Sequence, residues 1–146
     1  MSSAYAHTTV QVEQYEIEAG WGDEPPVVEL QNTLVIDIRE LNENGVRSAI
    51  ASAFKNLDAS VISGGASKSL DINSGTILGS YYAKIIPTKT GTMSVQLVGE
   101  LNGLEIDIVI PVEDVESQSI LQFPQVSGSS SAGEIGAVKN ALSSLQ

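Results

Sequence analysis

The residue best suited to chemistry is His7, the single histidine of the 146-residue chain. Ala4-Tyr5-Ala6 has the small-x-small form of a signal-peptidase site, and cleavage there would make His7 the N-terminal residue. An N-terminal histidine chelates copper through its amine and Nδ1, although a full site needs a second imidazole, which this chain lacks. As printed, residues 1–6 block that amine. Copper binding at His7 is therefore the alternative to an exposed, inert histidine.

Three aromatic residues are candidates for a binding surface: Trp21, Tyr81 and Tyr82. Exposed aromatic side chains dominate many binding interfaces. Trp21 is the only tryptophan and stands just before the rigid Pro25-Pro26 corner. For Trp21 the more common alternative is a position in the core, and the sequence leaves both interpretations open.

Composition argues against several other kinds of site. The chain has no cysteine, so thiolate metal sites, disulfides and cysteine nucleophiles are absent. Its 7 basic and 18 acidic side chains give a net charge of −11, which leaves no basic face for nucleic acid. One histidine near a terminus argues against a Ser-His-Asp triad, and no phosphate-binding glycine loop is present. We expect no enzymatic activity and no cofactor, with copper as the alternative.

Acidic residues cluster after one predicted strand, at Glu113, Asp114 and Glu116. Calcium favours oxygen-rich loops of this kind, but the spacing matches no calcium-loop motif. The favoured interpretation is a solvated acidic edge that discourages pairing between sheets.

The elements that must position these residues are strands. Residues 93–101 and 104–110 alternate apolar and polar side chains, which is typical of half-buried strands. Asn102-Gly103 between them suits a two-residue type I′ turn. That turn predicts that Leu101 opposes Leu104, and it aligns the two apolar faces. The sequence therefore predicts a hairpin here.

Further strands are predicted by the same alternation. A second hairpin is expected over 57–72 with its turn at Gly64-Gly65, and single strands over 33–39 and 81–86. Near the N-terminus the apolar positions switch from even to odd numbers after Val12, which suggests a β-bulge or a change of partner strand. Residues 46–56 are compatible either with a short helix or with a crossing between sheets. Six to eight short strands predict an all-β, immunoglobulin-like antiparallel β-sandwich.

The composition changes after Pro124. We expect the sandwich to span residues 7–124, a Ser/Gly linker to follow at 125–133, and an amphipathic helix over 134–146. Residues 1–6 are interpreted as the remnant of a signal peptide or of an expression vector. Apolar residues of the helix repeat at coiled-coil spacing and form a candidate assembly seam, at Ile135, Val138, Leu142 and Leu145. The helix is too short to be stable alone, so it either packs on its own domain or on a partner, or begins a longer stalk or anchor.

Several stretches resemble a known group of proteins: 15–21, 24–28, Asn32, 53–57, 64–68, 86–91, 112–115 and 123–124. With them the chain resembles uncharacterised, exported cell-surface proteins of ammonia-oxidising archaea, over nearly its whole length. The resemblance implies a preceding signal peptide and a membrane anchor after the terminal helix, both outside this chain. A second resemblance is at the level of fold alone. Bacterial periplasmic immunoglobulin-like domains, including copper-resistance and oxidase-maturation proteins, have a similar pattern before a strand, here formed by Tyr82, Ile86, Pro87 and Gly91.

The sequence thus predicts a non-enzymatic, extracytoplasmic domain for cell-surface binding or assembly. Its partner is expected to be another protein or a second copy of itself. We expect no binding to nucleic acid. We expect contact with a membrane only through segments that are not part of this chain. One alternative is a copper-binding accessory protein that uses His7. The other is a structural subunit of a surface layer or filament.

Overall fold

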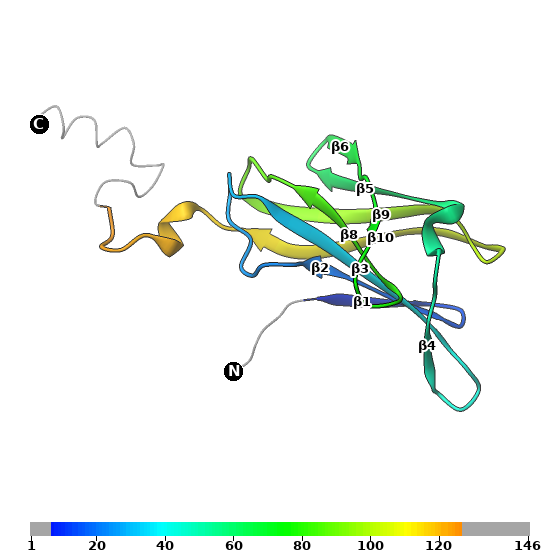
Figure 1. Cartoon of the computed structure of the whole chain (residues 1–146). Helices are drawn as coiled ribbons and strands as arrows, with labels where there is room; N and C mark the ends of the chain where they lie inside the picture. The colour runs from blue at the N-terminus through cyan, green and yellow to red at the C-terminus, as the bar shows by residue number, and fades with distance from the viewer. Residues whose placement is uncertain (1–6, 127–146) are drawn as a thin grey trace, which may run out of the picture. The chain divides into compact units, whose positions relative to one another are not determined.

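The computed structural model describes residues 7–126 (Figure 1). The chain divides after Glu116, and the strands all belong to the first unit. Of the second unit the structure describes residues 117–126, which contain the 3-10 helix η2 (Gln118–Leu121). Residues 1–6, most of the expected linker, and the expected helix with its seam at Ile135, Val138, Leu142 and Leu145 lie outside the described residues. The domain boundary expected at residue 124 stays a prediction.

The described strands form two antiparallel sheets. In the first sheet the neighbours are, in order, β1 (Thr8–Val12), β2 (Tyr15–Trp21), β3 (Asn32–Leu41), β8 (Ser80–Ile85) and β7 (Asn73–Ser74), and β4 (Arg47–Ala49) pairs with β3. In the second sheet they are β10 (Leu104–Val115), β9 (Gly91–Leu101), β5 (Leu57–Ser63) and β6 (Ala66–Ser69). Apart from two short 3-10 turns, the regular structure of the described part therefore consists of strands.

The strand order is that of an immunoglobulin-like sandwich. Immunoglobulin sheets have the orders A-B-E-D and C-F-G, the letters following the chain. Here β2-β3-β8-β7 occupy the places of A-B-E-D, and β5-β9-β10 those of C-F-G, with β6 as an extra strand beside C. The predicted fold class, an immunoglobulin-like antiparallel β-sandwich, is confirmed for the described residues. The strand β1 is an addition that extends the first sheet beyond strand A.

The core lies between the inner faces of the two sheets. Alternate residues of each long strand point inward, so the burial pattern has the period of two that the sequence shows. The largest fully buried side chains are mainly aliphatic and include Ile17, Leu34, Ile36, Ile38, Leu97, Leu101, Ile106 and Ile110, with Trp21 among them. An aliphatic core of this kind gives the sites below a rigid support.

The hairpin of β9 and β10 has the predicted register. Leu101 pairs with Leu104, and Val95 pairs with Ile110. Asn102 and Gly103 both have positive φ, 51° and 88°, as a type I′ turn requires. The second predicted hairpin is also present as β5 and β6, joined by Gly64-Gly65, although its return strand ends at Ser69.

The parity switch near the N-terminus is neither a bulge nor a change of partner. Val12 pairs with Tyr15, and Val10 pairs with Ile17, so β1 and β2 form a tight hairpin. A two-residue turn always places an even position opposite an odd one, and Glu13 supplies the positive φ of 53°. The expectation of a bulge was wrong because Glu13-Gln14 lacks the glycine that usually identifies such a turn.

Residues 46–56 form a crossing between the sheets, not an α-helix. The segment leaves the first sheet at β4, makes a single 3-10 turn η1 (Ala53–Lys55), and enters the second sheet at β5. The Tyr81 hydroxyl holds the crossing, because it donates to the main-chain oxygen of Ile50 and accepts from the N–H of Ala53 at 3.0 Å. Phe54 packs edge-on against the Tyr81 ring. This crossing carries the chain from one sheet to the other.

Candidate functional site

The structure places His7 directly before β1, beside Gly20 of β2. An ideal Cβ on Gly20 would lie 2.1 Å from Cδ2 of the His7 ring, so the ring occupies the space that a side chain at position 20 would need. The glycine therefore sets where the imidazole lies. His7 lies beside Gly20 because of the register of the β1–β2 hairpin. Thr8 pairs with Ala19, so the residue before Thr8 lies next to the residue after Ala19.

Both nitrogens of the His7 ring contact hydrogen-bond acceptors. Nδ1 lies 2.9 Å from a carboxylate oxygen of Glu18, and Nε2 lies 3.2 Å from the main-chain oxygen of Trp21. Nε2 is also 3.4 Å from a carboxylate oxygen of Glu24. Only the protonated ring donates from both nitrogens, so this arrangement favours imidazolium. Partial burial of the ring opposes its charge, but the contacts with Trp21, Glu18 and Glu24 outweigh burial and raise the pKa of His7.

Glu113 extends this acidic environment. One of its carboxylate oxygens, Oε1, is buried without a hydrogen-bond partner in the described residues. Burial raises the pKa of Glu113, and the charges of Glu24, Glu116 and Asp114 raise it further, while His7 lowers it. The structure thus brings His7 into one electrostatic group with Glu18, Glu24 and Glu113.

Copper binding at His7 stays a prediction. Within residues 7–126, no three His, Cys, Asp or Glu side chains are arranged to hold a metal ion. Nδ1, the atom that would chelate copper together with a free amine, contacts Glu18 instead. Copper binding through Nδ1 would therefore have to displace Glu18. The calcium alternative likewise stays a prediction, and Asp114 accepts a hydrogen bond from Thr92 at 3.1 Å.

Two of the three predicted binding aromatics are buried. Trp21 is 1 % exposed, and its Nε1–H donates to the main-chain oxygen of Glu113 at 2.8 Å. Tyr81 is 4 % exposed and holds the crossing described above. An exposed platform of Trp21, Tyr81 and Tyr82 is therefore wrong, since only Tyr82 is accessible and it is half-buried. For Trp21 the core alternative is correct.

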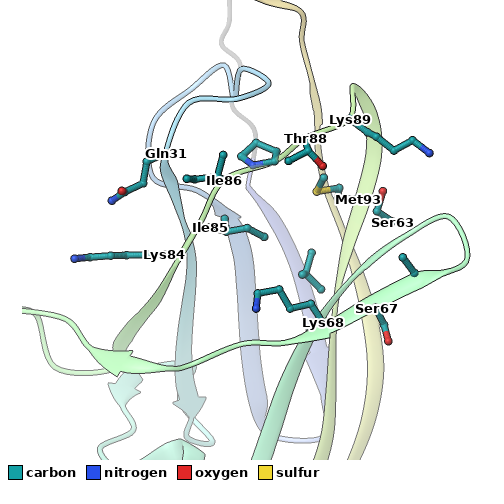
Figure 2. Close-up of a pocket in the computed structure, with 13 residues that line it drawn as sticks. Gln31, Ser63, Ser67, Lys68, Lys84, Ile85, Ile86, Thr88, Lys89 and Met93 are labelled. Carbon is teal, nitrogen blue, oxygen red and sulfur yellow. The ribbon is translucent and has the colours of Figure 1, made fainter.

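A groove that sequence reasoning missed lies between the two sheets (Figure 2). It has a volume of about 540 Å³, which is in the range of ligand sites. Its apolar lining comes from three strands and the loop after β8: Val61, Ile85, Ile86, Pro87 and Met93. Ile85 and Met93 face one another across it, while Lys84 and Lys89 extend outward from opposite rims (Figure 2). We call this site the lysine groove.

The lysine groove is basic on an acidic molecule. Lys68, Lys84 and Lys89 line it, and no acidic residue does. They are three of the six lysine and arginine side chains in residues 7–126, the others being Arg39, Arg47 and Lys55. Within that range none of the three has a carboxylate within 4.0 Å, whereas Arg47 pairs with Glu16 at 2.7 Å. The three ammonium groups are thus available to an external anion.

One signal in the sequence points to this groove. Residues 59–99 contain three lysines and a single acidic residue, Asp71, in a chain of net charge −11. The lysines do not form a motif, because they come from β6, β8 and the loop that follows β8. Only the fold brings them to one opening.

The fold and the groove define an immunoglobulin-like domain with a basic cleft between its sheets. Among the described residues, no helix is long and apolar enough to cross a membrane.

No protein-family model and no curated protein matches the chain. A search of solved structures finds a similarity to the crystal structure of the Lin-41 filamin domain, at 15 % sequence identity and a TM-score of 0.39, covering 68 % of this chain and 92 % of that one. The fold class stated here depends on the strand order and not on that likeness.

Proposed function

We propose that this chain is a non-enzymatic, extracytoplasmic domain that binds or assembles with another polypeptide at the cell surface. The observation that carries the proposal is the lysine groove, where an apolar lining lies beside three ammonium groups that pair with no carboxylate of residues 7–126, on an otherwise acidic molecule. Apolar contact supplies affinity, and the lysines select the charge of the partner.

The cell-surface location is supported by the resemblance to exported archaeal surface proteins over 15–21, 24–28, 53–57 and 64–68. A net charge of −11 also keeps the domain soluble and opposes random self-association. If the partner is a second copy, the domain is a subunit of a surface layer or filament.

A photo-crosslinking amino acid at Ser67 tests this proposal in intact cells that produce the full protein. Ser67 lines the groove on β6, whereas Ser48 on β4 lies far from it and serves as the matched control (Figure 1). We expect the Ser67 variant to give a crosslinked polypeptide that the Ser48 variant does not give. Mass spectrometry of the product distinguishes a second copy from another protein. Equal products from both positions, or no product, would overturn the proposal.

Copper binding is the second candidate function. The contact that supports it is the proximity of the Glu18 and Glu24 carboxylates to the His7 ring, although these three side chains are not arranged to hold a metal ion as they stand. Its test requires protein that begins at His7, and the last part of the Discussion gives the expected result.

A further inference from the structure

The lysine groove lies between two free strand edges. Strand β6 ends the second sheet and pairs only with β5 among the described strands. Strand β8 pairs with β3 over Ser80–Ile85, but its other neighbour, β7, covers only Tyr81 and Tyr82. The part of β8 that lines the groove therefore has no neighbouring strand on the groove side in the described residues.

The main chain of Lys84 faces this open side. The N–H of Gly75 donates to the oxygen of Ser80 at 2.7 Å, on the side where β7 pairs with β8. Main-chain groups of successive strand residues point to opposite sides, so Tyr82 and Lys84 direct theirs the same way as Ser80. Tyr82 pairs with Asn73, whereas Lys84 lies beyond the end of β7. Its N–H and C=O are placed to pair with an added strand.

The chemistry of the groove indicates what that strand contains. Side chains of an extended peptide alternate between two faces, so every second one would reach the apolar lining at Ile85 and Met93. Acidic side chains would meet the ammonium groups of Lys68, Lys84 and Lys89 near the rim. An acyl chain would satisfy the apolar lining but would leave the Lys84 main chain without a partner.

We propose that an extended, acidic segment of a partner polypeptide adds as a strand to the free edge of β8 and fills the lysine groove. The inference rests on the proposed function, since it names the partner chemistry of the same site. Affinity comes from main-chain hydrogen bonds and from apolar side chains in the groove, and the three lysines select acidic segments.

Binding of a short capped peptide with alternating glutamate and valine tests the inference, by fluorescence anisotropy on the full chain. We expect saturable binding that weakens as salt is raised, and no binding of the peptide with lysine in place of glutamate. Lys84→Ala removes one surface charge, so binding should weaken by about threefold. Lys84→Pro also removes the outward N–H, and binding should weaken by about tenfold or more.

Three controls keep the result interpretable. Lys55→Ala removes the same charge outside the groove and should leave binding unchanged. A thermal melt establishes that Lys84→Pro is folded, as expected for proline on a free edge. A probe peptide N-methylated at alternate residues blocks strand pairing without any change in the protein, and it should bind about tenfold or more weakly even if Lys84→Pro does not fold.

Each contrary result has a separate meaning. If folded Lys84→Pro or the N-methylated peptide binds as well as its counterpart, strand addition is wrong. If the acidic peptide fails to bind while Ser67 still crosslinks to a polypeptide, the acidic-strand inference falls and the proposed function stands. If anionic phospholipid vesicles bind through Lys68 and Lys84 and the peptide does not, the groove recognises lipid and the inference is overturned.

Discussion

The indole N–H of Trp21 donates to the main-chain oxygen of Glu113 at 2.8 Å, and this bond joins β2 in one sheet to β10 in the other. Few side chains of the core have a polar group, and this bond is one of the polar contacts that join the two sheets near His7. The same tryptophan also offers its main-chain oxygen to the His7 ring. The only tryptophan thus connects the core to the acidic group around His7.

Replacing Trp21 should measure the strength of that connection. Trp21→Phe keeps an aromatic ring but loses the hydrogen bond, and we expect a loss of about 1–3 kcal/mol in the free energy of unfolding. Trp21→Ala also leaves a cavity and should cost about 3–5 kcal/mol. Urea unfolding followed by circular dichroism measures both values. Tyr82→Phe, at a half-buried position, is the control, and a Trp21→Phe protein as stable as the wild type would contradict the structural role.

Much of the fold is local in origin, which is why the sequence predicts it well. The register of β9 and β10 follows from Asn102-Gly103 and from strict alternation on both sides of it. The turn between β1 and β2 uses Glu13-Gln14, which carries no such signature, so its parity switch was misread. A turn without the residues that usually form turns, such as glycine or asparagine, is difficult to recognise from a single sequence.

The candidate sites depend on tertiary arrangement, and the sequence predicts them only in part. His7 stands out as the lone histidine, but its contact with Glu24 requires the chain to turn back after β2. Trp21 packs in the core, and Tyr81 holds the crossing between the sheets. Nothing in the local sequence of either residue distinguishes such a buried role from a place on an exposed binding surface. The lysine groove needs β6 and β8 from different sheets to approach, which no local pattern encodes.

The protonation of His7 should couple to stability. Its folded pKa is raised above 6.5, so the stabilising contribution is fully present below that pH and is lost as pH rises through the folded pKa. We expect the NMR titration of this single histidine to give a pKa above 6.5. His7→Gln should remove the part of the stability that falls over this pH range.

Gly20→Ala is a control for the same contacts. The new methyl group would occupy the space of the His7 ring, so the ring should swing away from Glu18 and Trp21. The pKa of His7 should then return toward its ordinary value, with both carboxylates unchanged. A raised pKa that persists in Gly20→Ala would show that these contacts are not its cause.

Neutralising Glu113 should stabilise the protein at neutral pH. Its folded pKa is raised by burial and by neighbouring carboxylates, so ionisation of this carboxyl group opposes folding, and stability is lost as pH rises through that pKa. Glu113→Gln removes the charge and should raise the Tm at pH 7, with the gain shrinking in acid. Glu43→Gln, in an exposed loop, makes the same change in net charge and is the control. A lower Tm for Glu113→Gln than for Glu43→Gln would contradict the assignment.

Metal addition separates the copper alternative from the proposed function. In protein that begins at His7, copper binding predicts a rise in Tm with Cu(II), equivalent to about 2.7 kcal/mol at a free concentration one hundred times the Kd. That rise should vanish in His7→Ala and in the chain extended by residues 1–6. The proposed function predicts no copper-specific shift. If Zn(II), Ca(II) and Cu(II) all leave the melt unchanged, metal binding of useful affinity is ruled out at this site.

Self-association distinguishes the groove from the terminal seam as the means of assembly. If the domain is a surface subunit, its mass in sedimentation equilibrium should increase with concentration. Leu142→Asp places a charge in the predicted apolar seam and should weaken association by about tenfold or more if the seam mediates it. Lys84→Glu reverses one charge of the groove, and it should instead weaken association if the free edge of β8 mediates it. If both variants associate as well as the wild type, neither surface mediates association. If the mass stays that of a monomer at all concentrations, the partner of the groove is a different polypeptide and not a second copy.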